Sequence, residues 1–228
     1  MPYTKLTQPA FLVKAGYFLL LLFHISGFIG ICFSPHSAWF LAHTPLNLLV
    51  AAACVGVFVP YRSPSFWAFT AITAVVGFWV EYVGINTGFP FGQYNYVGSI
   101  MGAQYKAVPL MLAIVWWLQV YCYGVVAQTL VYKGVGAAQT TKQGIVRAAV
   151  AAAMMVTTDY PMELLANRAH LWHWQNGTAP WQNYAGWFGY GFLLQGLFVF
   201  LPFGKQNPMA AVYCVVTTAF FAALHFFW

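Results

Sequence analysis

The sequence predicts an all-α fold, a polytopic transmembrane helix bundle of about seven spans that forms one domain over residues 1–228. The first observation is composition: 61% of the residues are hydrophobic and 5% are charged, whereas soluble domains carry about 25% charged residues. The second is that the apolar residues fall into seven stretches of the length that crosses a hydrocarbon core of about 30 Å. The connections between them are too short to fold alone.

The predicted spans end at Pro, Gly and charged residues. They cover residues 15–33, 44–61, 65–86, 107–132, 144–166, 184–202 and 208–228. The first span follows two lysines, as in a signal peptide, but it is longer than the hydrophobic region of such a peptide, so we expect it to be retained. The second is short, although Thr44 and Pro45 form a helix-start signal. A six-span arrangement is the alternative.

Basic residues are distributed unequally over the two predicted sides of the membrane. With seven spans, one side receives Lys5, Lys14, Arg62, Lys133, Lys142, Arg147 and Lys205. The other side receives only Lys106 and Arg168, together with the two longest connections, 87–106 and 167–183. The positive-inside rule therefore predicts a multi-pass protein of the bacterial inner (cytoplasmic) membrane with its N-terminus in the cytoplasm. The basic residues form no patch, which excludes nucleic acid as a partner.

The chain has three acidic residues, Glu81, Asp159 and Glu163, and all three fall in predicted spans. A carboxylate in a span costs at least about 2.5–3.5 kcal/mol on insertion scales, so such residues usually face the bundle interior and serve a function. Both spans that carry them run outward, which predicts that the three acids converge in the outer half of the bundle. Asp159 and Glu163 are four residues apart and therefore share a helix face. Such a pair can supply a proton donor and a proton acceptor.

The acids could also serve in ion pairs or in a metal site. Each acid could pair with a base at the membrane interface, such as Arg168 or Lys106. Alternatively, His170 and His173 could join the acid pair in a metal site, but no second histidine motif of the desaturase kind is present. We therefore expect neither a metal nor another cofactor.

Aromatic residues follow the acids in both long connections. Tyr94 and Tyr96 come after Glu81 in a segment rich in Gly and Pro, which predicts a fixed turn. Trp172 and Trp174 come after the acid pair, and the polar and aromatic residues Asn183 and Trp187 follow. A single ring of this kind is typical of the aromatic belt at a membrane interface. As a set around three acids, these rings suit a dry cavity that creates and shelters a carbocation.

Three blocks of sequence resemble the membrane carotenoid 1,2-hydratases of the CruF type, including the bisanhydrobacterioruberin hydratase relatives. The first block, residues 81–96, is similar to the family signature E-x-x-G-x-x-T-G-x-P-F-G-x-Y-x-Y. The second is Val108-Pro109 followed by Trp116. The third contains Asp159, Glu163, Trp172, Trp174, Pro180, Asn183, Gly186 and Trp187. The resemblance covers about residues 78–190, and it departs from the family where Glu163-Leu164 replaces a second Asp-Pro and a proline stands at Pro161.

The resemblance implies addition of water across the C1=C2 double bond of an acyclic carotenoid end, in a lipid-soluble substrate such as lycopene or γ-carotene, without a cofactor. On this interpretation Asp159 donates the proton, Glu163 is its partner and Glu81 orients the water, and the first two roles could be exchanged. The rings of the two connections would line the cavity, with Tyr94, Tyr96, Trp172, Trp174, Asn183 and Trp187 as the substrate-binding set.

Three rival functions share features with this pattern. A lycopene-type cyclase begins with the same protonation but quenches the cation with an internal double bond. A proton-coupled transporter also uses membrane carboxylates, but the paired broken helices of such proteins are absent from the sequence pattern. A retinal-binding protein is disfavoured because the last predicted span, 208–228, contains no lysine.

Overall fold

The computed structural model describes residues 9–131 and 140–228. Its helices are α1 (Ala10–Phe33), α2 (Ser37–Ala42), α3 (Thr44–Val57), α4 (Pro64–Thr87), α5 (Met111–Val131), α6 (Thr141–Glu163), α7 (Trp181–Phe200) and α8 (Pro208–Phe227). Its strands have two residues each: β1 (Tyr94–Asn95), β2 (Gln104–Tyr105), β3 (Val108–Pro109) and β4 (His173–Trp174). The all-α prediction is therefore confirmed.

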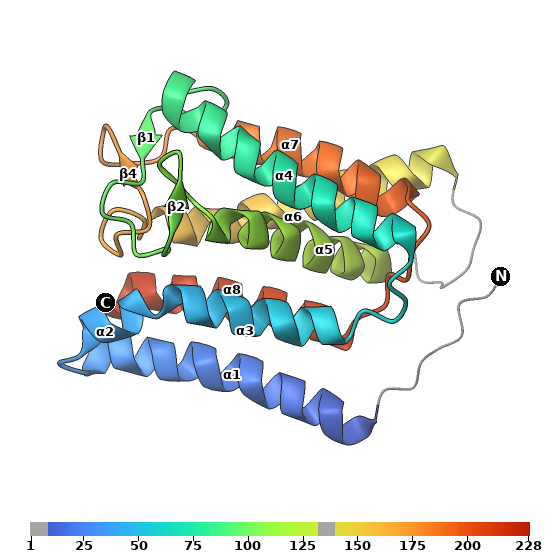
Figure 1. Ribbon diagram of the computed structural model, residues 1–228, viewed down its shortest axis with the longest axis horizontal. Coiled ribbons are helices and arrows are strands. Elements are labelled where there is room, and N and C mark those ends of the chain that lie inside the picture. The colour runs from blue at the N-terminus through green and yellow to red at the C-terminus, as the bar shows by residue number, and fades with distance from the viewer. Residues whose placement is uncertain (1–8, 132–139) are drawn as a thin grey trace.

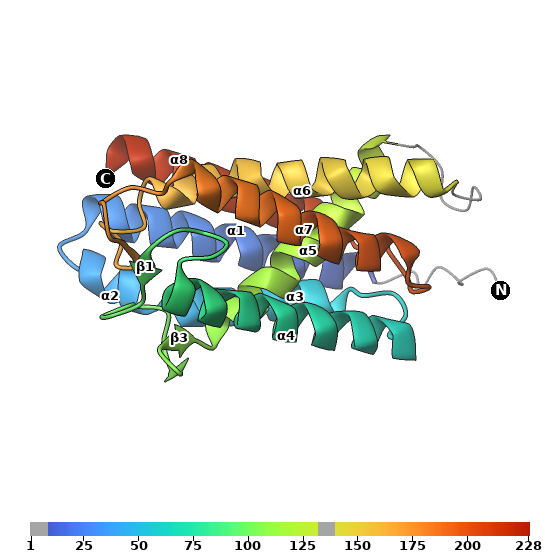
Figure 2. The same cartoon turned by 90° about the horizontal axis from the view of Figure 1, so that it is seen from above.

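The helices other than α2 lie side by side along the long axis, and consecutive ones run in opposite directions (Figure 1). The strands, α2 and the C-terminus gather at one end. Helix α5 passes obliquely through the middle of the bundle (Figure 2) and packs on α3, α4, α6, α7 and α8. Because α4 and α6 both run toward the end that carries the strands, their C-terminal turns lie at that same end.

Local sequence signals set the bounds of the two helices that carry the acids. At the start of α4, Ser63 Oγ accepts a hydrogen bond from the Phe66 amide, and a proline follows the cap, as is common at the first helical position. Thr140 and Gln143 form a reciprocal capping box at the start of α6. These caps fix where each helix begins, and thereby which residues reach its far end.

Helix α5 is the core of the bundle. It is apolar on all sides, as expected of a helix surrounded by others, and Trp116, Leu118 and Tyr121 on it are fully buried. Close approach of α4 requires glycine at Gly77, where an added Cβ would overlap the Trp116 side chain. This close contact places the Trp116 side chain directly against α4.

The surface of the bundle is that of a membrane protein. Helix α1, for example, exposes the large apolar side chains Phe11, Phe18, Ile25, Ile29 and Phe33. Among the described residues, α1, α4, α5 and α8 are long and apolar enough to cross a membrane. Each of the seven predicted spans contains one helix, but α3 has 14 residues and ends at Val57 rather than at position 61. The count of seven spans stays a prediction.

Candidate functional site

The two long connections that carry the aromatic motifs are joined to each other. Strands β1 and β4 pair antiparallel, with Tyr94 opposite Trp174 and Asn95 opposite His173. Because side chains alternate along extended backbone, residues two positions apart point to the same side. The spacing of Tyr94 and Tyr96, repeated in Trp172 and Trp174, therefore directs four rings into the protein, and all four are buried.

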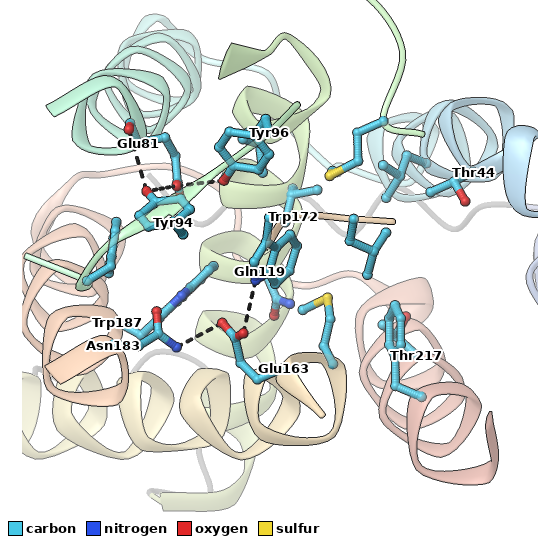
Figure 3. Close-up of a pocket in the computed structure, with 18 of the residues that line it drawn as sticks. Thr44, Glu81, Tyr94, Tyr96, Gln119, Glu163, Trp172, Asn183, Trp187 and Thr217 are labelled. Atoms are coloured by element: carbon cyan, nitrogen blue, oxygen red, sulfur yellow. Dashed lines mark hydrogen bonds between the residues drawn. The ribbon is translucent and has the colours of Figure 1, made fainter. Parts of the chain in front are cut away.

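A cavity of about 70 Å³ lies under this ladder, between the ends of the helices (Figure 3). All six predicted substrate-binding residues line it: Tyr94, Tyr96, Trp172, Trp174, Asn183 and Trp187. Two carboxylates, Glu81 from α4 and Glu163 from α6, also line it. Asp159 is 1% exposed and is not among the described residues that form the wall.

Glu81 accepts three hydrogen bonds from neutral donors. Tyr94 and Tyr96 donate their hydroxyls to Oε2 over 2.7 and 2.8 Å, and Trp116 Nε1 donates to Oε1 over 3.0 Å. Burial and the nearby Glu81 raise the pKa of Tyr94 and Tyr96 well above the usual range, so both phenols keep their protons and act as donors. This arrangement suits Glu81 as a fixed acceptor.

Gly84, one turn after Glu81, makes room for the first of these hydrogen bonds. A Cβ at Gly84 would overlap the Tyr94 hydroxyl oxygen. Gly88 then ends α4 in the left-handed conformation at φ 75°, and its amide bonds to the carbonyl of Gly84, as in a glycine helix cap. The glycines of the first sequence block therefore turn the chain back so that Tyr94 reaches Glu81.

Glu163 and Asp159 share one amide. Asn183 Nδ2 on α7 donates to Glu163 Oε1 over 2.8 Å and to Asp159 Oδ2 over 3.0 Å. Glu163 Oε2 also accepts from Trp172 Nε1 at 3.0 Å and Trp174 Nε1 at 2.6 Å. Within the described residues, Asp159 Oδ1 is buried without a hydrogen-bond partner. The predicted shared helix face of the two acids is confirmed by this common partner.

The basic residues that could pair with the acids at the interface lie elsewhere. Lys106 lies over the rings of Trp79 and Tyr82, with Nζ 5.5 and 5.2 Å from their centroids. The guanidinium of Arg168 lies 4.4 Å from the Trp228 ring centroid. The hydrogen bonds that the carboxylates accept within residues 9–131 and 140–228 come from indoles, phenols and an amide. Interface ion pairing therefore does not account for the acids.

The histidines beside the acid pair pack on each other. The rings of His170 and His173 meet edge to face with centroids 5.6 Å apart. In the described part of the chain, no three His, Cys, Asp or Glu side chains gather in a way that would hold a metal ion.

Phe91 and Trp187 line the cavity and pack on Trp116, which is not among the described residues of its wall. Trp116 and Trp187 stack at a centroid distance of 4.3 Å with their planes 5° apart. Phe91 packs beside both, at 6.5 and 6.3 Å. Aromatic faces attract cations, by about 0.5 to 2 kcal/mol per contact. This side of the cavity can therefore stabilise positive charge without supplying a nucleophile.

The cavity also contains residues that the sequence did not assign to the site. Gln119 on α5 lines it at 1% exposure, and its side-chain oxygen Oε1 has no hydrogen-bond partner among the described residues. Helices α3 and α8 contribute Thr44, Leu48, Tyr213, Thr217 and Phe221. The residues on α3 and α8 lie in spans where the sequence pattern shows only hydrophobicity, so nothing in that pattern assigns their side chains to the site. Trp116 was part of the resembling blocks, but its bond to Glu81 was not predicted.

Comparison with known proteins identifies a family. The profile of a family described as "carotenoid biosynthesis protein" matches residues 43–228. This range contains every described residue that lines the cavity. No curated protein and no solved structure matches the chain.

Proposed function

Because this chain belongs to the family of carotenoid biosynthesis proteins, we propose that it is a carotenoid hydratase that adds water across the C1=C2 double bond of an acyclic end group. The observation that carries the proposal is the cavity itself. It is lined mainly by apolar and aromatic side chains and contains the carboxylates of Glu81 and Glu163. Such a site can protonate an alkene, shelter the cation and supply water in one place.

The position of the carboxylates supports an exchange of the first two roles inferred from the sequence. A group that protonates the substrate has to reach it, and of the acid pair Glu163 lines the cavity. We therefore assign Glu163 as the group that transfers its proton to C2, and Asp159 as its partner through Asn183. The π electrons form the new C–H bond, which leaves a tertiary cation at C1 and a carboxylate at Glu163.

Glu81 is positioned to complete the reaction. It is held by three donors on α5 and the first connection, so it can orient a water molecule without moving. The water oxygen forms the C1–O bond, and its surplus proton leaves by way of Glu81 and returns to the acid pair. One water is consumed, a tertiary alcohol is formed, and the acid is restored without redox chemistry.

Gln119 Oε1 has no hydrogen-bond partner within the described residues, and this favours hydration over cyclisation. A buried carbonyl oxygen without a hydrogen bond costs about 1–3 kcal/mol, and a hydrocarbon substrate cannot supply the missing bond. A water molecule in the cavity can. A cyclase has no use for such a water, since an internal double bond of the substrate quenches its cation.

The substrate class follows from the family and the surroundings. A carotenoid such as lycopene or γ-carotene is dissolved in the bilayer, and the reacting end has to reach a cavity that lies within the helix bundle. We expect no cofactor, because protonation and water capture require only the side chains already named.

The experiment is expression in cells that accumulate lycopene or γ-carotene, followed by mass analysis of the pigments. The wild type should yield a product heavier by one water. Glu163→Gln, Asp159→Asn and Glu81→Gln should each reduce its formation by more than about a hundredfold, the usual contribution of a positioned acid or base.

Thr73→Val is the matched control, because Thr73 is a buried polar residue on α4 that lies outside the described cavity wall. It should retain wild-type hydration at equal protein level. A ring-containing product of unchanged mass would show a cyclase instead. Wild-type rates in all three carboxylate variants would rule out the acid site.

A further inference from the structure

A second cavity adjoins the catalytic one. Its volume is about 260 Å³, and it lies between α1, α2, α3 and α8. Six residues line both cavities: Thr44, Leu48, Leu171, Tyr213, Thr217 and Phe221. A larger groove of about 420 Å³ beside α3, α4 and α5 has no described wall residue in common with the catalytic cavity. The second cavity is therefore the continuation of the site, and the groove is separate.

The catalytic cavity is too small for a whole carotenoid. At about 70 Å³ it falls well below the roughly 300–1,000 Å³ of pockets that enclose a drug-sized ligand. A long polyene whose end group reacts there has to extend beyond it. The space next to the shared wall is the second cavity.

The chemistry of the second cavity suits a hydrocarbon. Its wall is mostly apolar, and two of its polar side chains bond to the protein. His24 Nδ1 lies 2.8 Å from the Leu20 carbonyl oxygen, and His24 Nε2 lies 3.3 Å from Thr217 Oγ1. Thr44 Oγ1 donates to the Leu41 carbonyl at 2.7 Å. In contrast to Gln119 in the catalytic cavity, these groups need no water.

The position of the second cavity also suits access from lipid. Helix α1 forms the outer wall of the second cavity. Among the described elements, it makes extensive contact with α2, α3 and α8 alone. The opposite face of α1 carries the exposed apolar side chains described above. A substrate dissolved in the bilayer can therefore approach the second cavity along α1.

We propose that the second cavity binds the polyene chain of the carotenoid substrate while the reacting end occupies the catalytic cavity. This inference rests on the proposed function for the identity of the ligand. It adds a binding site for a long conjugated hydrocarbon, with α1, α2, α3 and α8 as its walls. These helices then determine how long a substrate the protein accepts.

The test fills the second cavity without touching the catalytic one. Gly27 on α1 lines only the second cavity, and a Cβ there would contact Phe220 at an ordinary 3.4 Å. Gly27→Leu should weaken lycopene binding to purified protein in lipid nanodiscs by about tenfold or more, measured by quenching of tryptophan fluorescence. Gly189→Leu, where an added side chain meets open space on α7, is the matched control and should bind as the wild type does.

Hydration assays separate chain binding from chemistry. Gly27→Leu should lose hydration of lycopene but keep hydration of a ten-carbon alkene that carries the same end group. Gly27→Ala adds one methyl group and favours the helix, so it covers the case in which the leucine variant does not fold, and it should give a smaller loss in the same direction.

Two failures are distinguishable. If the wild type hydrates lycopene and the Gly27 variants bind and hydrate it as well as Gly189→Leu does, the second cavity does not hold the polyene while the proposed function stands. If no carotenoid is hydrated but lycopene binds with the expected dependence on Gly27, the proposed reaction is wrong and the polyene site stands.

Discussion

Individual hydrogen bonds define the part that each acid plays in the site. Glu163 accepts from two indoles and one amide, so its orientation is fixed at the cavity wall. Asp159, four residues earlier, reaches the same amide but has an oxygen without a partner in the described residues. The helical spacing predicted that the two acids share a face. It could not predict which of them reaches the cavity, because that depends on side chains from another helix and from the second connection.

Removing one indole donor should impair catalysis without unfolding the protein. Trp174 Nε1 donates to Glu163 Oε2 at 2.6 Å, and a hydrogen bond to a charged group is worth about 1.5–3 kcal/mol. Trp174→Phe should therefore lower the hydration rate by about tenfold to a hundredfold, with thermal stability in detergent close to that of the wild type.

Trp117→Phe is the matched control for this prediction. The Trp117 indole is also buried and donates, but its acceptor is Thr70 Oγ1 at 3.2 Å, outside the described cavity wall. Equal hydration rates in the two variants would show that the bond to Glu163 plays no part in the reaction.

At the scale of elements, the ends of α4 and α6 are brought together by the connections that follow them. Alternating helix directions predicted that the acids on these helices converge at one end, because both helices run the same way. The tyrosine and tryptophan pairs at a spacing of two were visible in the sequence, but their pairing as β1 and β4 was not predicted. Such a short ladder depends on tertiary contacts, since two residues have little strand propensity of their own.

A change at Gly84 should show that the space this glycine leaves on α4 positions the Tyr94 hydroxyl. In Gly84→Ala the new Cβ would overlap the Tyr94 hydroxyl oxygen, so the hydroxyl has to move away from Glu81. Alanine also favours the helix by about 1 kcal/mol relative to glycine, which offsets part of the packing penalty. Hydration should fall at least as far as in Tyr94→Phe, while the protein stays folded.

Gly189→Ala provides the comparison for Gly84→Ala, because it makes the same change on α7 in open space. A Gly84→Ala enzyme as active as Gly189→Ala would refute the steric role of Gly84.

For the whole molecule, the sequence predicted an α-helical membrane bundle because composition alone excludes a soluble domain. The number of crossings is harder to predict. Helices α6 and α7 carry the site and are less apolar along their length, and α3 is short. Hydropathy averages the apolar character of all side chains on a helix. It therefore identifies helices that face lipid more readily than α6 and α7, which pack mainly on their neighbours. The walls supplied by α3 and α8 escaped prediction because the sequence pattern of these two spans shows only hydrophobicity.

The topology prediction can be tested with reporter fusions. Seven crossings with a cytoplasmic N-terminus place Trp228 outside the cytoplasm and Lys142 within it. Alkaline phosphatase, which folds only outside the cytoplasm, should be active when fused after Trp228 and inactive when fused after Lys142. An inactive fusion after Trp228 with an active one after Lys142 would mean the reverse orientation, and two fusions of equal activity would mean that the number of spans is wrong.

The family match contains the whole described wall of one cavity and part of the wall of the other. Every described residue of the catalytic cavity lies within residues 43–228, whereas α1 and α2, which form the outer wall of the second cavity, precede that range. Part of the wall of the proposed polyene site therefore lies outside the matched range. If the proposed polyene site is correct, exchanging the first 42 residues between members of the family should change the length of substrate accepted and leave Glu81, Asp159 and Glu163 in place.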